Sequence, residues 1–598
     1  MFGYTAPIRD MRFVMREIVD IEGLSQLPGC DAATPDTVDA ILEEAGKLAG
    51  GVIAPLNRTG DQTGSKVENG VVRTPEGWRE AYRQFVDGGW NSIPFEPEFG
   101  GQGLPITVAS ACAEMWNSAN MAWGLCPLLT IGSVEALTAH GSDEQKQTYL
   151  EKLVSGEWTG TMCLTEPQAG SDLALLRTKA VKQDDGTYAI TGTKIFITYG
   201  EHDLTENIVH LVLARTPDAP AGVKGISLFI VPKFLVNADG TLGQRNDLRC
   251  ASLEHKLGIH GSPTAVMQFG DGGGATGYLI GEENRGLQYM FTMMNNARLN
   301  VGIQGYAIAE RAYQQALAYA QERRQGRAAG AEGAAPLIMH PDVRRNLMLM
   351  KSQTEAARAL GLYTAAMIDR ARHTEDAEAR RLAQRRVEVL IPIVKGWSTD
   401  LGFELASTGV QIHGGMGYVE ETGAAQHLRD ARICLIYEGT NGIQAMDLVG
   451  RKLSMDNGQS IKALVAEMGA AADALKAVEG DDAATIAAAL AEAVAAADDA
   501  TDWLIAQAGS DAQAVLSGAT AYARLMGTVA GGWMMAISAA AAIRGLSEGA
   551  DDAAFLEAKL ITARFYAEQV LPLAAGLART VKAGSASIMA LSPEQFAA

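Results

Sequence analysis

The stretch TYAITGTKIFITYG, from Thr187 to Gly200, decides the class of fold. Most of its apolar side chains are β-branched or aromatic, and glycines interrupt and end it, which is a composition typical of β-strands. Three runs of the same kind follow before residue 282: IVHLVLAR, GISLFIVP and TAVMQFG. We therefore predict a β domain between residues 160 and 282.

Apolar residues recur at helical spacing on both sides of this segment. The helical pattern runs from Val38 to Leu153 around the loop PFEPEFGGQGLP, and it returns from Leu287 to Leu453. Thr34 and Pro35 have the residue types of an N-cap and a first helical position. After SMDNGQS the chain becomes rich in alanine and acidic residues, which favours further helices. The sequence thus predicts an α+β fold in which helices precede and follow a β-barrel-like domain.

The changes of pattern give five parts. They are an N-terminal extension (1–35), an N-terminal helical domain (36–158), a middle β domain (159–282), a C-terminal helical domain (283–455) and an appended helical domain (460–598). The appended domain contains no cluster of residues suited to catalysis. We interpret it as a structural cover or an interface.

Composition excludes several functions. The net charge of -20 opposes binding of nucleic acid, which requires a basic face. The six cysteines form no C-x-x-C pair, so neither a disulfide framework nor a metal site is indicated. The N-terminus lacks an apolar signal core, and no uninterrupted apolar run reaches the ~18 residues of a membrane span. We expect a cytoplasmic protein that does not insert into membranes.

The decapeptide LIYEGTNGIQ, Leu435 to Gln444, contains a carboxylate among apolar side chains. Apolar surroundings destabilise a charged carboxylate and raise its pKa, which makes Glu438 a candidate general base. The alternative is an ordinary ion pair between Glu438 and Arg429 or Arg432. The decapeptide alone leaves both possibilities open.

Four other motifs carry polar or glycine residues that can face a ligand. They are TMCLTEPQAGSDLALLRT (161–178), KIFITYG (194–200), YAQERRQGR (319–327) and QIHGGMGY (411–418). In the second motif, Phe196 and Thr198 alternate onto one face of a strand. Each motif taken alone has a simpler explanation as a turn, a basic helix end or a glycine stop.

Taken in order, six motifs resemble the acyl-CoA dehydrogenase family over residues 36–455. They are CLTEPQAGSD, KIFITYG, GLQYMFTMMNNARLNVGIQG, YAQERRQG, QIHGGMGY and RDARICLIYEGTNGIQ. The resemblance implies a β domain between two helical domains and a bound FAD. It also implies oxidation of an acyl-CoA thioester to the trans-2-enoyl-CoA, with electrons passed to electron-transfer flavoprotein.

The resemblance assigns roles residue by residue. It makes Glu438 the catalytic base that removes the α-proton. It places Leu164, Thr165, Gly170 and Ser171 along the flavin and its pyrophosphate, Phe196 and Thr198 against the isoalloxazine ring, and Thr440 and Gln444 on the same flavin wall. Arg323, Gln325, Gln411 and Gly415 match positions that hold the adenosine half of FAD across a subunit interface. Substrate contacts fall on Ser171, Arg298 and Gly439, while Asn295 stands where many members carry aspartate.

The leader and the appended domain are similar to a subgroup that includes 3-methylmercaptopropionyl-CoA dehydrogenases. This likeness implies a homodimer that converts 3-methylthiopropanoyl-CoA to methylthioacryloyl-CoA in the breakdown of dimethylsulfoniopropionate. The alternatives are a medium- or long-chain fatty acyl-CoA dehydrogenase, an acyl-CoA oxidase and a non-catalytic flavin-bound scaffold. Retention of Glu438 argues against the scaffold.

Overall fold

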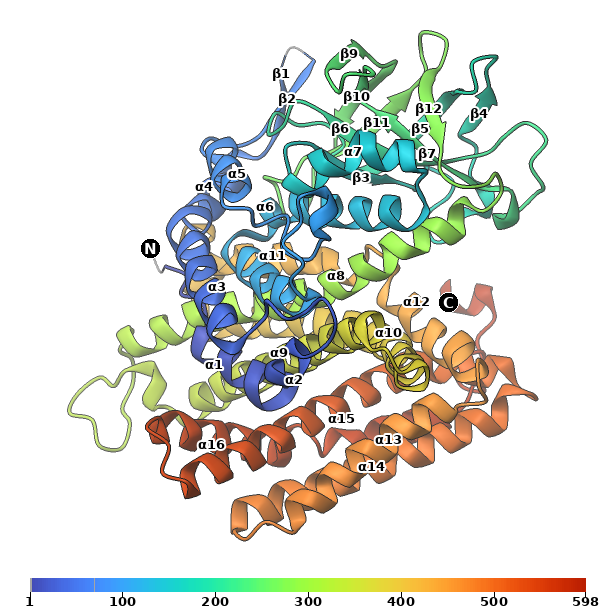
Figure 1. Cartoon of the computed structure of the whole chain (residues 1–598). Helices are drawn as coiled ribbons and strands as arrows, with labels where there is room; N and C mark the ends of the chain where they lie inside the picture. Colours follow the sequence, from blue (N-terminus) through green and yellow to red (C-terminus); the bar gives the residue numbers. More distant parts are fainter. Residues whose placement is uncertain (1–2, 69, 598) are drawn as a thin grey trace. The chain divides into compact units, whose positions relative to one another are not determined.

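The computed structural model describes residues 3–68 and 70–597 of the chain (Figure 1). The chain forms two compact units. The first comprises Met1–Glu43, Pro105–Glu114 and Val301–Ala598, and the second comprises Glu44–Leu104 and Met115–Asn300. The long helices α6 (Ile106–His140) and α8 (Gly286–Glu322) contribute residues to both. Each unit is described below by itself.

The second unit contains the predicted β domain. Its eight-stranded sheet has the order β10-β11-β5-β12-β7-β6-β3, with β4 paired to β5. Strands β3 and β6 run parallel, and the other paired neighbours run antiparallel. The strands are β3 (Thr159–Cys163), β4 (Lys179–Lys182), β5 (Tyr188–Thr198), β6 (Ile208–Ala214), β7 (Ser227–Pro232), β10 (Leu248–Leu253), β11 (Thr264–Phe269) and β12 (Ala275–Leu279), and a separate pair is β8 (Phe234–Val236) with β9 (Leu242–Arg245).

Burial explains why the middle strands of this sheet carry continuous apolar runs. Every residue of β6 and β7 is buried, so both faces of these strands are covered. The core of the sheet includes Ile190, Val212, Phe229 and Phe269. The predicted α+β class, with helices before and after a β domain, is confirmed.

The N-terminal helical region also contains strands that were not predicted. Besides α4 (Pro55–Thr63), α5 (Trp78–Asp87) and α7 (Asp143–Ser155), it has a hairpin of β1 (Lys66–Glu68) and β2 (Val71–Arg73). The prediction of an all-helical block was therefore wrong here. The sequence VENGVVR contains the Asn-Gly pair typical of tight hairpins, and that signal was available.

The first unit is built from long helices. Its elements in chain order are α1 (Ile8–Val14), α2 (Ile21–Ser25), α3 (Pro35–Leu48, shared with the second unit), α9 (Pro341–His373), α10 (Ala377–His413), α11 (Ala424–Ala431), α12 (Asn441–Asp447), α13 (Gln459–Lys476), α14 (Asp481–Ala508), α15 (Ala512–Ser547), α16 (Ala553–Gln569) and α17 (Leu573–Lys582). The backbone N–H of Thr37 donates to the Thr34 hydroxyl, which confirms the predicted cap of α3. Figure 1 shows α13 to α16 as a layer of orange and red helices beside α9 and α10.

Glycines let the appended helix α15 approach α10 closely. A Cβ on Gly527 would lie 2.2 Å from Cγ of Trp397, and one on Gly531 would lie 2.6 Å from the same indole. The Trp397 side chain therefore packs where two side chains are missing. This contact gives the alanine- and glycine-rich sequence of α15 a packing role.

Seven charged side chains form a buried ion cluster in the first unit. The Arg358 guanidinium donates to Asp10 at 2.6 Å, to Glu114 at 2.6 Å and to Glu310 at 2.7 Å. The Lys559 ammonium donates to Asp10 at 2.6 Å and to Glu355 at 2.8 Å, and Lys351 also pairs with Glu355. The cluster (Asp10, Glu114, Glu310, Lys351, Glu355, Arg358, Lys559) joins the leader, the central helices and the appended domain.

Two helices are long and apolar enough, by length and composition, to cross a membrane. Among the residues that the structure describes they are α6 and α15, each of which has an apolar window of 18 residues. In each, 83% of that window is buried inside the protein. Burial within the fold accounts for the apolar character of both.

Candidate active site

The loop after β3 is held in shape by a buried ion pair. Lys194 on β5 donates from Nζ to Oε1 of Glu166 at 2.8 Å and to the carbonyl of Leu164 at 3.0 Å. The Glu166 carboxylate also accepts from the backbone N–H groups of Arg177 and Thr178. Glu166 therefore ties both ends of the loop 164–178 together beneath its exposed tip.

The pKa values of this pair reflect burial and mutual attraction. Burial alone would raise the pKa of Glu166, but the Lys194 ammonium and the hydrogen bonds lower it to about 2. Burial lowers the pKa of Lys194 to about 8, although Glu166 opposes the change. Sequence analysis missed both residues. Their signal was a glutamate inside the motif CLTEPQAGSD and a lysine at the start of KIFITYG.

Phe196 projects from a bulge in β5. The pairing of β5 with β11 shifts between Lys194 and Ile197, and Phe196 has a left-handed φ of 59°. Regular alternation would place Lys194 and Phe196 on one face, whereas the structure buries Lys194 and leaves Phe196 58% exposed. The strand is therefore irregular at this point, while Ile197, between Phe196 and Thr198, is buried. The bulge turns a large aromatic ring outward.

Hydroxyl groups that can bind a ligand lie on β5, the strand that carries Phe196, and on the loop next to it. The N–H of Ile195 donates to the carbonyl of Thr165 at 2.9 Å, so the loop and the bulge are adjacent. Within the described part of the chain, the hydroxyls of Thr165, Ser171 and Thr198 form no hydrogen bond. Gly170 is exposed, and a Cβ there would meet open space. An exposed ring on a strand, with a hydroxyl-bearing loop next to that strand, suits a flat heterocycle with polar edges.

Arg298 and Ser171 differ in exposure. Arg298 on α8 is only 7% exposed, while Ser171 lies at the exposed tip of its loop. Asn300 donates to Asn296 one turn away, which orders the polar side of α8. The structure therefore leaves Ser171 directly accessible to a ligand in this unit and buries most of Arg298.

In the first unit, Glu438 lies in a left-handed turn. Glu438 has a φ of 56° and Gly439 a φ of 79°, and the Glu438 side chain is half-buried. Left-handed backbone costs an ordinary residue about 1–2 kcal/mol and persists only where neighbours enforce it. Such strain is concentrated at functional sites. It therefore supports a functional interpretation of Glu438.

The turn is held from both sides. Nε2 of Gln444 donates to the carbonyl of Glu438 at 3.1 Å, and the hydroxyl of Thr440 accepts from the N–H of Ile443 to cap α12. The buried ammonium of Lys395 on α10 donates to the carbonyl of Gly439 at 2.8 Å. On the preceding side, the Tyr437 hydroxyl donates to Gln304. Thr440 and Gln444 thus shape the turn itself.

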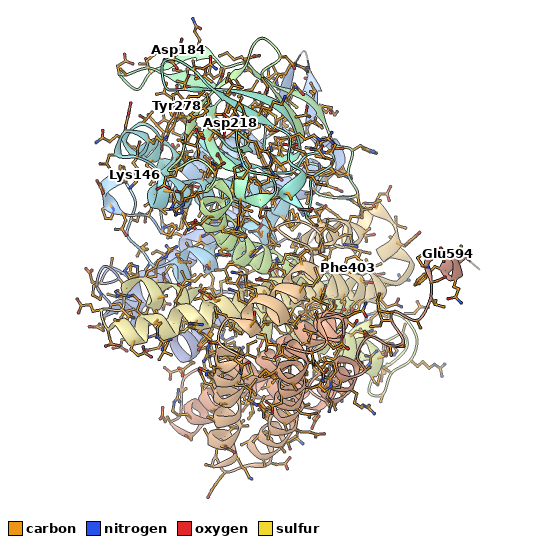
Figure 2. All side chains as sticks on the ribbon, turned by 90° about the vertical axis from the view of Figure 1, so that its right-hand side faces the viewer. Lys146, Asp184, Asp218, Tyr278, Phe403 and Glu594 are labelled. Atoms are coloured by element: carbon orange, nitrogen blue, oxygen red, sulfur yellow. The ribbon has the colours of Figure 1, made fainter. Side chains whose placement is uncertain are left out.

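The two arginines considered as partners of Glu438 have other contacts. Arg429 forms a bidentate ion pair with Glu420, with both N···O distances at 2.9 Å. The Arg432 guanidinium lies 5.7 Å from the centre of the Phe403 ring, which Figure 2 labels on α10. These contacts give both arginines a role that does not involve Glu438.

The remaining candidates form a second group in the first unit. Arg323 and Gln325 follow the end of α8, Gln411 and Gly415 lie at the end of α10, and all four are exposed. The rings of Tyr319 and His413 stack at 4.4 Å and hold these two helix ends together. Gln411 is 16 residues beyond Lys395 on α10, a rise of about 24 Å. The group therefore lies well away from the Glu438 turn.

Comparison with known proteins assigns the family. Models of the acyl-CoA dehydrogenase N-terminal, middle and C-terminal domains match residues 36–157, 161–271 and 284–453. A model described as acetyl-CoA dehydrogenase C-terminal like matches residues 460–592. The 3-methylmercaptopropionyl-CoA dehydrogenase of Ruegeria pomeroyi is 54% identical over 95% of this chain and 96% of its own. The chain belongs to the acyl-CoA dehydrogenase family.

Other relatives of this acyl-CoA dehydrogenase also match it over nearly its full length. A butyryl-CoA dehydrogenase of Syntrophomonas wolfei is 35% identical over 99% of both chains. The solved structure of ACDH-11 from Caenorhabditis elegans, in complex with C11-CoA, has a TM-score of 0.76 and 21% identity, and covers 98% of this chain and 95% of its own. The protein is therefore an oxidoreductase that acts on the CH–CH bond of an acyl-CoA and binds FAD. The predicted family, enzyme class and cofactor are confirmed.

Proposed function

We propose that Glu438 is the base of this acyl-CoA dehydrogenase. The observation that carries the proposal is the strained turn at Glu438 and Gly439, which neighbouring side chains hold in place. A general base must be oriented toward the proton that it removes. The turn provides that orientation.

The residues of the second unit fit the flavin. Phe196 offers an exposed ring, and Thr165, Ser171 and Thr198 offer hydroxyls without a hydrogen bond to residues 3–68 and 70–597. Gly170 would leave room for the pyrophosphate. Leu164, whose carbonyl accepts from Lys194, would lie along the flavin at the start of the same loop. Arg298 and Ser171 are the proposed contacts of the CoA moiety.

The mechanism divides between cofactor and protein. FAD, when bound, supplies the acceptor for a hydride from the β-carbon of the substrate. Glu438 would remove the α-proton, and its own backbone N–H, next to Gly439, would donate to the thioester oxygen. Hydrogen bonds to a thioester oxygen stabilise the negative charge that develops as the proton leaves. Thr440 caps α12, and Gln444 donates to the carbonyl of Glu438, so both fix the turn to the start of α12.

For the substrate we propose 3-methylthiopropanoyl-CoA, converted to methylthioacryloyl-CoA in dimethylsulfoniopropionate breakdown. The support is the 54% identity to a relative named for that substrate, against 35% for one named for butyryl-CoA. Both relatives span nearly the whole chain, so the shared appended domain does not separate the two activities. The alternative is dehydrogenation of medium- or long-chain fatty acyl-CoAs.

A series of acyl-CoAs tests the substrate. Sulfur replaces a methylene with little change of shape, and a hydrophobic pocket separates such near-isosteres by only ~1–3 kcal/mol. We expect overlapping kcat/KM for methylthiopropanoyl-, butyryl- and valeryl-CoA, falling as the chain lengthens from four to sixteen carbons. The assay uses an artificial electron acceptor. A maximum at twelve or more carbons would establish the long-chain alternative and leave the role of Glu438 unaffected.

The electron acceptor that we propose is electron-transfer flavoprotein. A dehydrogenase of this kind passes electrons to a protein partner, whereas an oxidase uses oxygen. Steady-state turnover with and without oxygen separates the two. Turnover that oxygen alone sustains at the full rate would assign the oxidase. Five of the six cysteines are buried, as structural thiols commonly are, and the location that we propose is the cytoplasm.

A homodimer is the proposed assembly, with neither nucleic acid nor membrane as partner. In Figure 1 the loop after α8, which begins at Arg323, lies at the far end of its unit from α12. The Arg323 and Gln411 group and the Glu438 turn are therefore separated on one chain. Binding of the adenosine half of FAD by Arg323, Gln325, Gln411 and Gly415 of a second copy would bring both groups to one cofactor.

Removal of Arg323 tests the shared site. An arginine bound to phosphate or adenosine oxygen contributes enough that Arg323→Ala should weaken FAD binding by about tenfold. The measurement is the ratio of flavin to protein absorbance after gel filtration, together with the molar mass. Arg327→Ala changes an exposed arginine on the same loop and serves as control. Full flavin content in a monomeric Arg323→Ala preparation would contradict the shared site.

A further inference from the structure

Lys395 on α10 is fully buried, at 0% exposure, beneath the turn that carries Glu438. An ammonium loses its hydration on burial and needs strong acceptors in return. Nζ of Lys395 donates to the carbonyl of Gly439 at 2.8 Å and to Oδ1 of Asn441 at 2.8 Å. These acceptors belong to the residue that follows Glu438 and to the first residue of α12. Lys395 therefore binds the segment that carries Glu438 at two points.

Asn441 extends this connection along α10. Its Nδ2 lies 3.1 Å from the carbonyl of Gly396, 2.9 Å from Oγ1 of Thr399 and 2.7 Å from Oδ1 of Asp400. One carboxamide thus accepts from Lys395 and contacts the next turn of the same helix. The beginning of α12 is fixed to α10 through polar contacts that are largely buried.

The carbonyl that Lys395 holds is important because the turn is strained. Glu438 and Gly439 both have left-handed φ values, and a Cβ on Gly439 would lie 2.8 Å from Nε2 of Gln444. The Glu438 carbonyl accepts from Gln444 and the Gly439 carbonyl accepts from Lys395. Both peptide planes after Glu438 are therefore held, one from α12 and one from α10. Together they fix the direction of the Glu438 side chain.

We propose that Lys395 is a positioning residue for Glu438, holding the Gly439 carbonyl so that the carboxylate meets the substrate α-carbon in reactive geometry. The proposal rests on the proposed role of Glu438 as base. Lys395 itself contacts the main chain of the turn and Asn441. Displacement of a reacting group by about 1 Å is enough to lower a rate by about 10²-fold.

Anaerobic single-turnover kinetics of Lys395→Met test the proposal. Methionine keeps the length and apolar bulk of the side chain and removes the ammonium. Mixing the FAD-loaded enzyme with butyryl-CoA or 3-methylthiopropanoyl-CoA should bleach the flavin about 10²-fold more slowly than in the wild type. FAD content and the Kd for crotonyl-CoA, measured from the flavin spectrum, should stay within about threefold. A merely structural role would reduce the amount of flavoprotein without changing the rate per bound flavin.

Lys559→Met is the matched control. Lys559 is another buried lysine of the same unit, 2% exposed, and it bonds to Asp10 and Glu355 rather than to the turn. We expect Lys559→Met to lower stability and to leave the bleaching rate per bound flavin unchanged. An equal slowing in this control would overturn the proposal, since loss of any buried lysine would then suffice.

Asn441→Ala provides a second route to the same question. It removes one acceptor of Lys395 and the contacts to Thr399 and Asp400, and it should slow bleaching about tenfold. A wild-type rate in either flavin-loaded variant overturns the proposal. Loss of flavin from both variants, with flavin retained in Lys559→Met, overturns it too, because Lys395 would then support the fold alone. Failure of the wild type to bleach with any acyl-CoA would instead refute the proposed function.

Discussion

Glu438→Gln should abolish reduction of the flavin by acyl-CoA while the protein keeps its fold and its FAD. The amide has almost the shape of the carboxylate and lacks a lone pair basic enough to accept the α-proton. Removal of a general base lowers the rate by up to about 10⁴-fold, and no other base is proposed at this turn. The measurement is the rate of flavin bleaching in one anaerobic turnover, with FAD content determined in the same sample.

Two variants sharpen this result. Glu438→Asp retains a base but withdraws it by one methylene, so an intermediate rate is expected. Glu557→Gln makes the same chemical change at an exposed position of α16 and should bleach at the wild-type rate. A Glu438→Gln variant that keeps a rate within tenfold of wild type would exclude Glu438 as the base. The strained turn would then need another explanation.

The loop 164–178 shows which parts of the candidate site the sequence predicts. The motif CLTEPQAGSD indicated the half-buried Thr165 and the exposed Gly170 and Ser171, because hydroxyls and glycine at a turn are visible in the sequence. It did not indicate that Glu166 is buried against Lys194, since that ion pair depends on how the loop after β3 packs against β5. Motifs report what faces a ligand more readily than what supports it.

The sequence also did not predict the backbone conformation at two residues of the candidate site, Phe196 and Glu438. The alternation in KIFITYG is regular, and only the register with β11 reveals the bulge at Phe196. The left-handed φ of Glu438 is likewise invisible, because glutamate rarely adopts it without support. The support comes from Lys395, which is 43 residues earlier in the chain. In both cases tertiary contacts impose a conformation that local propensity disfavours.

The buried ion cluster could not be predicted either, and it has the largest expected effect on stability. Its members come from positions as distant as Asp10 and Lys559, and the local sequence around each of them does not indicate its partners. In the structure, four carboxylates face three cations: Asp10, Glu114, Glu310 and Glu355 against Lys351, Arg358 and Lys559. When all seven groups are ionised, the buried cluster therefore carries one excess negative charge.

Arg358→Met should destabilise the protein by about 3–5 kcal/mol, because it leaves three carboxylates buried around an uncharged side chain. The thermal unfolding midpoint, followed by tryptophan fluorescence, measures the loss. Arg381→Met removes an arginine that pairs with Glu378 on the exposed surface of α10 and should leave the midpoint unchanged. A similar midpoint for both variants would show that Arg358 does not hold the leader on the central helices.

The excess charge also predicts a dependence of stability on pH. Burial raises the pKa of Glu114 to about 7, and the nearby carboxylates of Glu310 and Asp10 add to the rise although Arg358 opposes it. In the unfolded chain this carboxyl returns to its ordinary pKa of 4.5. Between these two values the folded state binds more protons, so the contribution of Glu114 to stability falls as pH rises from 4.5 to 7. Glu114→Gln should remove this slope, even though the amide binds Arg358 less well and lowers the midpoint at every pH. Parallel pH profiles of wild type and Glu114→Gln would place the excess charge on another member of the cluster.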